Sequence, residues 1–212
     1  PASAGRSSTN GSFLREFKAL GRQQIITSLA IAILVMVGQY SLFTFVAPLL
    51  LEVTGLDSNM VPWMLLLYGT GATIGVFVGG RLADWKLMPS LIAILATQAL
   101  GFVLLYAVSP YPLAMAIVMV FWGGVNFAFG SPLQSRVLLW AGDAPNLASA
   151  LIPASFNLGI AIGAVLGAAL LDSGFGYRNL PLIGAGALVL ATAVALISYW
   201  YERRSPQRQP AG

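Results

Sequence analysis

Residues 61–86 read VPWMLLLYGTGATIGVFVGGRLADWK, which is twenty uncharged and mostly apolar positions followed by a short charged segment. About 20 apolar residues in a helix cross the hydrocarbon core of a bilayer. Arg81, Asp84 and Lys86 end the apolar run, as expected where a chain reaches a membrane surface. This stretch therefore predicts a transmembrane helix with a charged connection after it.

Similar apolar stretches lie on both sides of this one. Only 8% of the residues in the chain are charged, whereas soluble domains carry about 25%. A chain in lipid must satisfy its backbone hydrogen bonds internally, so each stretch should be a helix. The sequence predicts an all-α membrane protein, a six-transmembrane-helix bundle over residues 25–200. Its spans are expected at 25–51, 61–80, 90–108, 113–133, 148–171 and 180–200.

The cations follow a pattern that orients the bundle. Threading the chain through six spans places ten of the eleven Lys and Arg residues on one side, and only Arg178 on the other. Because cationic loops remain in the cytoplasm, both termini should be cytoplasmic. The ten are Arg6, Arg15, Lys18, Arg22, Arg81, Lys86, Arg136, Arg203, Arg204 and Arg208.

The two ends of the chain should lie outside the bundle. Residues 1–24 are expected to be a cytoplasmic linker, and residues 201–212 a cytoplasmic tail. Within 12–22, apolar residues recur at helical spacing among cations, which predicts a short helix on the lipid surface. An unstructured basic linker is the alternative. Because the chain begins with Pro1 and not with Met, we expect it to be the later part of something longer.

The composition argues against enzyme and cofactor chemistry. The chain has no Cys and no His, so no thiolate or imidazole can bind a metal or act as a nucleophile or base. All seven acids lie in connections or at span edges, and no carboxylate occupies a span centre, where proton relays usually have one. We expect no enzyme activity, no metal and no cofactor. The net charge of +4 reflects the loop bias, so no nucleic-acid partner is expected.

The spans form a repeat. Spans one and four, two and five, and three and six begin 87 to 90 residues apart. Three is an odd number, so the second triplet enters the membrane from the opposite side, as in inverted-repeat transporters. Spans two and five each carry three glycines four residues apart, a stripe that lets another helix approach closely. That helix can belong to this chain or to a domain outside it. The glycines are Gly71, Gly75, Gly79, Gly159, Gly163 and Gly167.

Two sets of residues resemble a known family. Gly80, Leu82, Ala83 and Asp84 match the G-x-L-A-D-R-x-G-R-R signature between the second and third helices of each half of major facilitator superfamily transporters. Trp85 departs from it, and the later glycine and basic pair are missing. Further on, WGG at 122–124, SPLQ at 131–134, AP at 144–145, ASA at 148–150 and FNLG at 156–159 are similar to the second half of bacterial drug:proton antiporter-1 type permeases.

The resemblance covers about residues 25–200 and implies helices seven to twelve of a twelve-helix fold. The chain would be the C-terminal half of a secondary active transporter, with an N-terminal six-helix half as its partner. The family implies export of a small drug, sugar or nucleoside by proton antiport across a bacterial inner membrane. It also implies that Gly80, Arg81 and Asp84 form a cytoplasmic latch between the halves. A solvated turn acid beside a topology-setting Arg is the alternative.

Candidate substrate contacts occur in spans one and four, the pair that lines the central cavity in this family. Their amides would hydrogen-bond a solute and their aromatic rings would pack on it. Alternatively, the amides join helices, a contact of about 1 kcal/mol. The candidates are Gln39, Tyr40, Phe43, Trp122, Asn126 and Phe129.

Other polar and aromatic residues receive weaker assignments. Tyr68 is a further cavity candidate, whereas Gln98 and Asn157 are expected to pack or bridge helices. Near the span ends, tryptophans are expected to anchor helices at the membrane surface; they are Trp63, Trp85, Trp140 and Trp200.

Different functions remain open. A stand-alone six-span protein could act as a homodimeric transporter or as a non-transporting membrane scaffold. A channel is disfavoured, because the sequence has no Asn-Pro-Ala motif, no carbonyl-rich filter and no charged ring.

Overall fold

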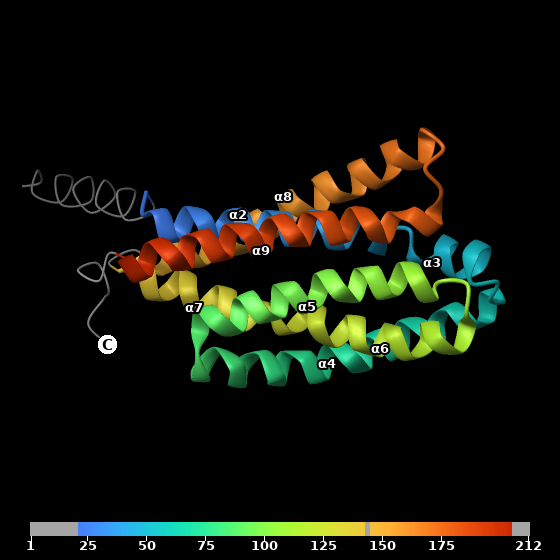
Figure 1. Ribbon diagram of the computed structural model, residues 1–212, viewed down its shortest axis with the longest axis horizontal. Helices are drawn as coiled ribbons and strands as arrows, with labels where there is room; N and C mark the ends of the chain where they lie inside the picture. Colours follow the sequence, from blue (N-terminus) through green and yellow to red (C-terminus); the bar gives the residue numbers. More distant parts are fainter. Residues whose placement is uncertain (1–20, 143–144, 205–212) are drawn as a thin grey trace, which may run out of the picture.

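The computed structural model describes residues 21–142 and 145–204, and every regular element in them is helical (Figure 1). Six helical segments of this part of the chain are long and apolar enough to cross a membrane. They lie side by side along the long axis of the molecule, and the described chain enters and leaves the bundle at the same end. The predicted all-α bundle of six membrane helices is confirmed.

The observed helices follow the predicted spans closely, with differences at their ends. Most of the segment 12–22, where a surface helix was predicted, lies outside the described residues. In chain order the elements are α2 (Gln23–Phe43), α3 (Val46–Pro48), the π-helical η1 (Leu49–Val53), η2 (Ser58–Met60), α4 (Val61–Trp85), α5 (Leu87–Val108), α6 (Pro112–Ala128), α7 (Gly130–Ala141), α8 (Pro145–Asp172), η3 (Tyr177–Asn179) and α9 (Leu180–Arg204).

The first and fourth spans are interrupted, each at a point set by a proline. Proline has no N–H to donate, and its ring clashes with the carbonyl group four residues earlier. Pro48 acts in this way on Thr44, where α2 has just ended, and Pro132 acts on Ala128, the last residue of α6. The first span of each repeat is therefore two helical segments and not one continuous helix.

The fourth span also extends further than predicted. After its break it continues as α7 to Ala141, eight residues past the expected end at 133. Arg136, expected in a cytoplasmic loop, is therefore in a helix, and its side chain is 0% exposed. The loop assignment was wrong because neighbouring helices supply partners for a buried guanidinium, which hydropathy along the chain does not show.

The charged segment after the second span is mostly helical as well. α4 continues through residues 80–85, where a loop was expected, and only Lys86 separates it from α5. Arg81, Leu82 and Ala83 have high helix propensity, so the helix continues past the membrane surface. Lys86 adopts an extended conformation (φ −150°, ψ 92°), which turns the chain back.

The helices pack in a pattern that repeats between the two triplets. α4, the second helix of the first triplet, packs on α6, the first span of the second triplet. In the same way, α8 packs on α2, and the third helices α5 and α9 pack on each other. The second helix of each triplet thus packs on the first helix of the other triplet, as expected when a two-fold axis relates two inverted repeats.

Each glycine stripe packs on a helix of this same chain. A Cβ atom at Gly163 would lie 2.7 Å from the carbonyl oxygen of Val37 on α2. A Cβ atom at Gly75 would overlap the carbonyl group of Gly124 on α6. The question of which helices the stripes contact is therefore settled within the described residues: α4 meets α6, and α8 meets α2.

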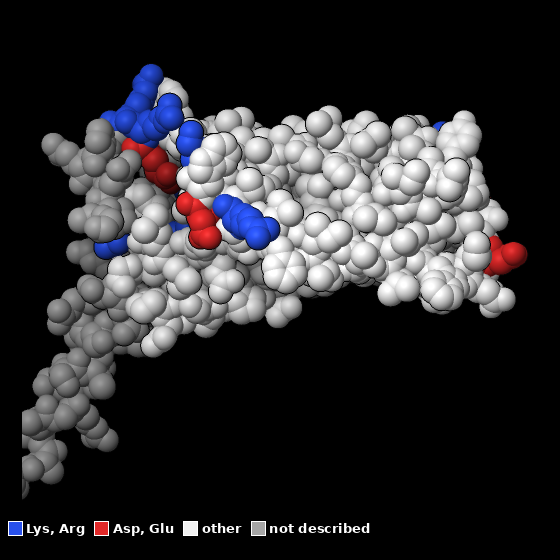
Figure 2. All heavy atoms as spheres, turned by 90° about the horizontal axis from the view of Figure 1, so that it is seen from below, with Lys and Arg blue, Asp and Glu red and all other residues white. Residues whose placement is uncertain are grey.

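Charged residues gather at the end of the bundle where α4 meets α5, while the long middle of the face seen in Figure 2 is uncharged. We call this the basic end. Three of the four span-end tryptophans are exposed, whereas Trp140, at the end of α7, is only 7% exposed and packs inside the bundle. The described cations of the basic end are Arg22, Arg81, Lys86, Arg136, Arg203 and Arg204.

Candidate functional site: a cavity among four helices

A cavity of about 350 Å³ lies among α2, α4, α6 and α8, with the start of α7 at its edge. These are the two helix pairs that the glycine stripes hold together, so close backbone packing fixes the cavity walls. No charged side chain of the described residues lines it. The lining residues are Met36, Gln39, Tyr40, Phe43, Tyr68, Asn126, Phe127, Phe129, Gly130, Pro153, Phe156, Asn157 and Ile160.

Gln39 is the most distinctive polar group of the cavity. Its side chain comes from α2 and is only 6% exposed. Its Nε2 atom is buried and has no hydrogen-bond partner among the described residues. A buried amide without a partner costs about 1–3 kcal/mol. A solute with a hydrogen-bond acceptor could supply the missing partner.

Asn126 lines the same cavity from α6 but already has hydrogen-bond partners. Its Nδ2 donates a hydrogen bond to the Tyr68 hydroxyl, 3.2 Å away. Gln98 of α5 lies behind it and donates from Nε2 to the Val125 carbonyl oxygen at 3.1 Å. Gln98 therefore joins α5 to α6, consistent with the predicted packing role, and Asn126 is held by Tyr68 at the cavity wall.

Aromatic rings make up much of the remaining wall. Phe43 lies 5.1 Å from Tyr68, centroid to centroid, and Phe129 lies 5.9 Å from Phe156. Trp122 contacts both Phe43 and Tyr68, yet it is 1% exposed and does not line the cavity. Trp122 lies behind the cavity wall and supports the rings of Phe43 and Tyr68, which line it.

The structure thus brings five of the six candidates to one cavity and places Trp122 behind them. It also adds residues from α8 that reasoning from the sequence missed. Pro153, Phe156 and Ile160 recur at helical spacing on one face of α8, a signal that was present in the sequence. Asn157, expected to join helices, instead lies exposed at the cavity, where no described residue hydrogen-bonds its side chain.

The candidate latch lies apart from the cavity, in the last turns of α4 at the basic end. Arg81 and Asp84 are exposed and three residues apart, so they share a helix face. Neither forms an ion pair with another described residue. A Cβ atom at Gly80 would meet nothing within 4 Å, so packing within the described chain does not require this glycine.

A helical bundle of inverted repeats around an uncharged cavity is the architecture of membrane transport proteins. The sequence profile of the Major Facilitator Superfamily matches residues 28–212. The chain therefore belongs to the Major Facilitator Superfamily, a family of membrane transporters and not of enzymes.

Individual relatives agree with this assignment. The chain is 33% identical over 193 residues to the inner membrane transport protein YdhP of Escherichia coli K12, covering 91% of this chain and 49% of YdhP. It is 33% identical over 192 residues to a chloramphenicol resistance protein of Streptomyces lividans, covering 89% and 47%. It is 31% identical over 206 residues to the MFS-type transporter YtbD of Bacillus subtilis 168, covering 95% and 52%. The chain spans about half the length of these relatives.

Proposed function

We propose that this chain is the C-terminal half of a secondary active transporter that exports small, uncharged, amphipathic solutes by proton antiport. The observation that carries the proposal is the buried amide of Gln39 among aromatic rings: within the described part of the chain it has no hydrogen-bond partner and no charged side chain lines its cavity. Alternating access would arise from rocking of this six-helix body against an N-terminal half.

The exposed faces of the bundle support a missing partner. In α4 and α8, 28% and 22% of the residues of the most apolar stretch are buried, against 39–56% in the other four spans. These two helices border the cavity from opposite repeats. A second six-helix body placed against them would close the cavity, as the half-length match to the relatives also suggests.

The cavity chemistry defines the class of solute. Tyr40, Phe43, Phe129 and Phe156 offer apolar ring surface, and Gln39 offers an N–H donor. Such a wall favours a flat or hydrophobic molecule with a carbonyl or hydroxyl acceptor over a charged one. Since no carboxylate lies mid-span in this chain, the proton-binding group would belong to the N-terminal half.

The basic end would face the cytoplasm of a bacterial cell. Positive charge in the short connections and at both chain ends favours this orientation. Arg81 and Asp84, exposed and without ion-pair partners among the described residues, would then form the latch to the N-terminal half when the transporter is closed on that side.

The test uses the intact transporter, purified through a tag after Gly212 and reconstituted into liposomes with an imposed pH gradient. A mass of about twice 22.3 kDa would indicate a fused two-half protein, and a mass of 22.3 kDa would favour the homodimer or scaffold alternatives. Radiolabelled chloramphenicol, inosine and arabinose serve as probes. We expect transport of at least one probe that stops when a protonophore collapses the gradient.

Two variants connect transport to the sites. Gln39→Leu should weaken apparent affinity about five- to ten-fold, the loss of one net hydrogen bond of about 1–1.5 kcal/mol. Gln23→Leu, at an exposed position of the same helix, is the matched control. Asp84→Asn should lower the transport rate with unchanged membrane insertion. Transport that does not depend on the pH gradient would contradict antiport, and absence of transport for every probe would contradict the exporter proposal.

A further inference from the structure

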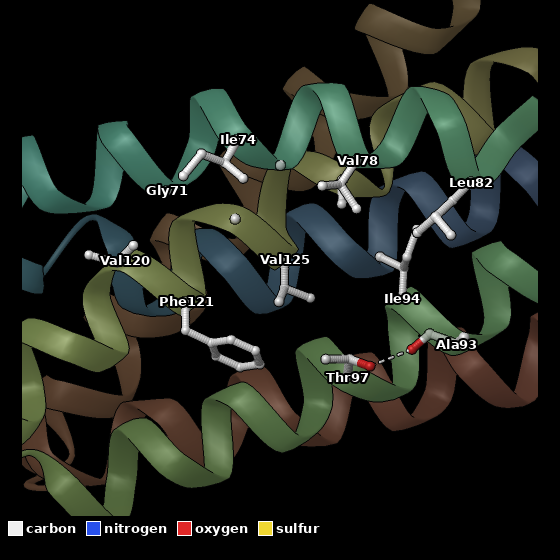
Figure 3. A pocket seen from close by; sticks show the side chains of 13 residues that line it. Gly71, Ile74, Val78, Leu82, Ala93, Ile94, Thr97, Val120, Phe121 and Val125 are labelled. Carbon is white, nitrogen blue, oxygen red and sulfur yellow. Dashed lines mark hydrogen bonds between the residues drawn. The ribbon is translucent and has the colours of Figure 1, made fainter.

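A second hollow lies on a different face of the bundle from the central cavity. It is an open groove of about 400 Å³ between α4 and α5, with α6 as its floor (Figure 3). On α6, Phe121 and Val125 line the groove, whereas Asn126 lines the cavity. The two hollows therefore lie on different sides of this helix. The groove is not part of the proposed transport path.

The groove is chemically uniform. Isoleucine, valine, leucine and alanine side chains and the ring of Phe121 line it, and the glycines of the α4–α6 contact form its base. Thr97 is its one hydroxyl, and that group already donates a hydrogen bond to the Ala93 carbonyl oxygen at 2.8 Å (Figure 3). Because no polar group in the groove needs a partner, only a hydrocarbon occupant suits it.

The length of the groove matches one leaflet of a bilayer. On α4 it runs from Gly71, near the middle of the helix, to Leu82, close to the basic end. Eleven residues of helix rise about 16 Å. Half of a hydrocarbon core is about 15 Å thick, so an acyl chain lying in the groove would begin at the membrane surface and end near the bilayer centre.

Positive charge lies at the basic end of the groove. Ile74 and Val78 line the groove, and Arg81 and Trp85 continue their face of α4 at helical spacing, both exposed. The Nζ atom of Lys86 lies 5.2 Å from the centre of the Trp85 ring. An exposed Trp with cations beside it is typical of the headgroup level.

We propose that this groove binds one anionic phospholipid of the surrounding membrane. An acyl chain occupies the space between α4 and α5, and the phosphate group lies between Arg81 and Lys86. Asp84 is the acidic neighbour on α4, which leaves a net charge of +1 over the three side chains. That charge favours a lipid whose headgroup is negative overall over a zwitterionic one, by about five-fold per cation near the surface.

The first test fills the groove. Ala93 is an exposed residue of α5 that lines it, so Ala93→Phe places a ring in the space of the acyl chain. Ala193→Phe makes the same change at an exposed position of α9 and is the matched control. Native mass spectrometry of the intact transporter, extracted mildly from membranes, counts retained phospholipids. We expect at least a three-fold loss of bound lipid in Ala93→Phe and none in Ala193→Phe.

The second test separates headgroup from chain. Delipidated wild-type protein is titrated with phosphatidylglycerol or phosphatidylcholine, and binding is read by the same method. Phosphatidylglycerol should bind about five-fold more tightly, and Lys86→Gln should remove most of that preference. Arg81 also belongs to the proposed latch, so the readout here is lipid binding and not transport. A failure of the lipid proposal can then be told from a failure of the latch proposal.

Distinct results would overturn the inference. Equal lipid retention in Ala93→Phe and its control would show that the groove holds no specific lipid. Loss of transport in Ala93→Phe, with lipid retention equal to that of the control, would show that a helix of the N-terminal half and not a lipid fills the groove. Val78→Trp, which fills the groove from α4, provides a second variant should Ala93→Phe fail to fold.

Discussion

Arg136 shows how a single buried charge joins three helices of the bundle. Its Nη1 atom donates a hydrogen bond to the Ser28 hydroxyl of α2 at 2.7 Å. Its Nη2 atom donates to the Ser198 hydroxyl of α9 and lies 2.6 Å from a carboxylate oxygen of Glu202. Because the guanidinium is fully buried, these partners replace the water that its Nη atoms have lost, while its Nε has no partner among the described residues.

Removing this guanidinium should destabilise the protein strongly. Arg136→Met leaves the carboxylate of Glu202 without its cation, which costs about 3–5 kcal/mol for a buried pair. Arg178→Met is the control, since among the described residues that exposed side chain has a cation–π contact with Tyr106 alone, worth about 1 kcal/mol. Thermal unfolding in detergent provides the measurement. Equal shifts in the two variants would contradict the assigned role, and adding Glu202→Gln to Arg136→Met should recover part of the loss.

The glycine stripes set the geometry of the helix pairs. Along α4 the carbonyl groups of α6 lie directly against Gly71, Gly75 and Gly79, while Gly69 of the same helix faces open space. Such close contact maximises dispersion between backbones, where a bilayer offers no hydrophobic drive for association. It also brings α4 and α8 to the cavity, so the stripes determine the cavity width.

Substitution by alanine should have opposite effects on stability at a glycine in the helix contact and at a glycine facing open space. Gly75→Ala puts a methyl group on the Gly124 carbonyl, so the helices must separate, and overpacking of this kind costs about 1–3 kcal/mol. Gly69→Ala adds the methyl group in open space and should stabilise the helix by about 0.5–1 kcal/mol. Thermal unfolding of both variants tests this. Equal behaviour would show that the α4–α6 contact is looser than described.

The interrupted spans show how far helix boundaries can be predicted. Pro48 and Pro132 each follow a break by three or four residues, so proline chemistry marks both as candidate break points, but Pro153 lies within α8 without interrupting it, so the sequence alone did not decide which prolines break a helix. The extension of α7 to Ala141 was not predictable, because its polar residues look like a loop until α2 and α9 supply partners. The same applies to residues 80–85, where charge marked a connection although the backbone remained helical.

For the molecule as a whole, the charge distribution implies an orientation that labelling can test. Lys86 joins α4 to α5 at the basic end, and Ser173 follows α8 at the opposite end. With the basic end in the cytoplasm, a membrane-impermeant maleimide should label Ser173→Cys in intact cells and Lys86→Cys only in inverted vesicles. This chain has no native Cys to interfere. The reverse labelling pattern would contradict the orientation.

The number of spans, the inverted repeat and most of the cavity candidates follow from local chemistry along the chain. Hydropathy, glycine spacing and amide–aromatic patterns are properties of residues close together in the sequence. They can therefore be assessed for each helix without knowing which helices it contacts. The partner of each glycine stripe, the burial of Arg136, the place of Trp122 behind the cavity wall and the groove on α4 depend on which helix faces which. Several of those pairings join residues more than a hundred positions apart, so they are decided only when the six helices pack.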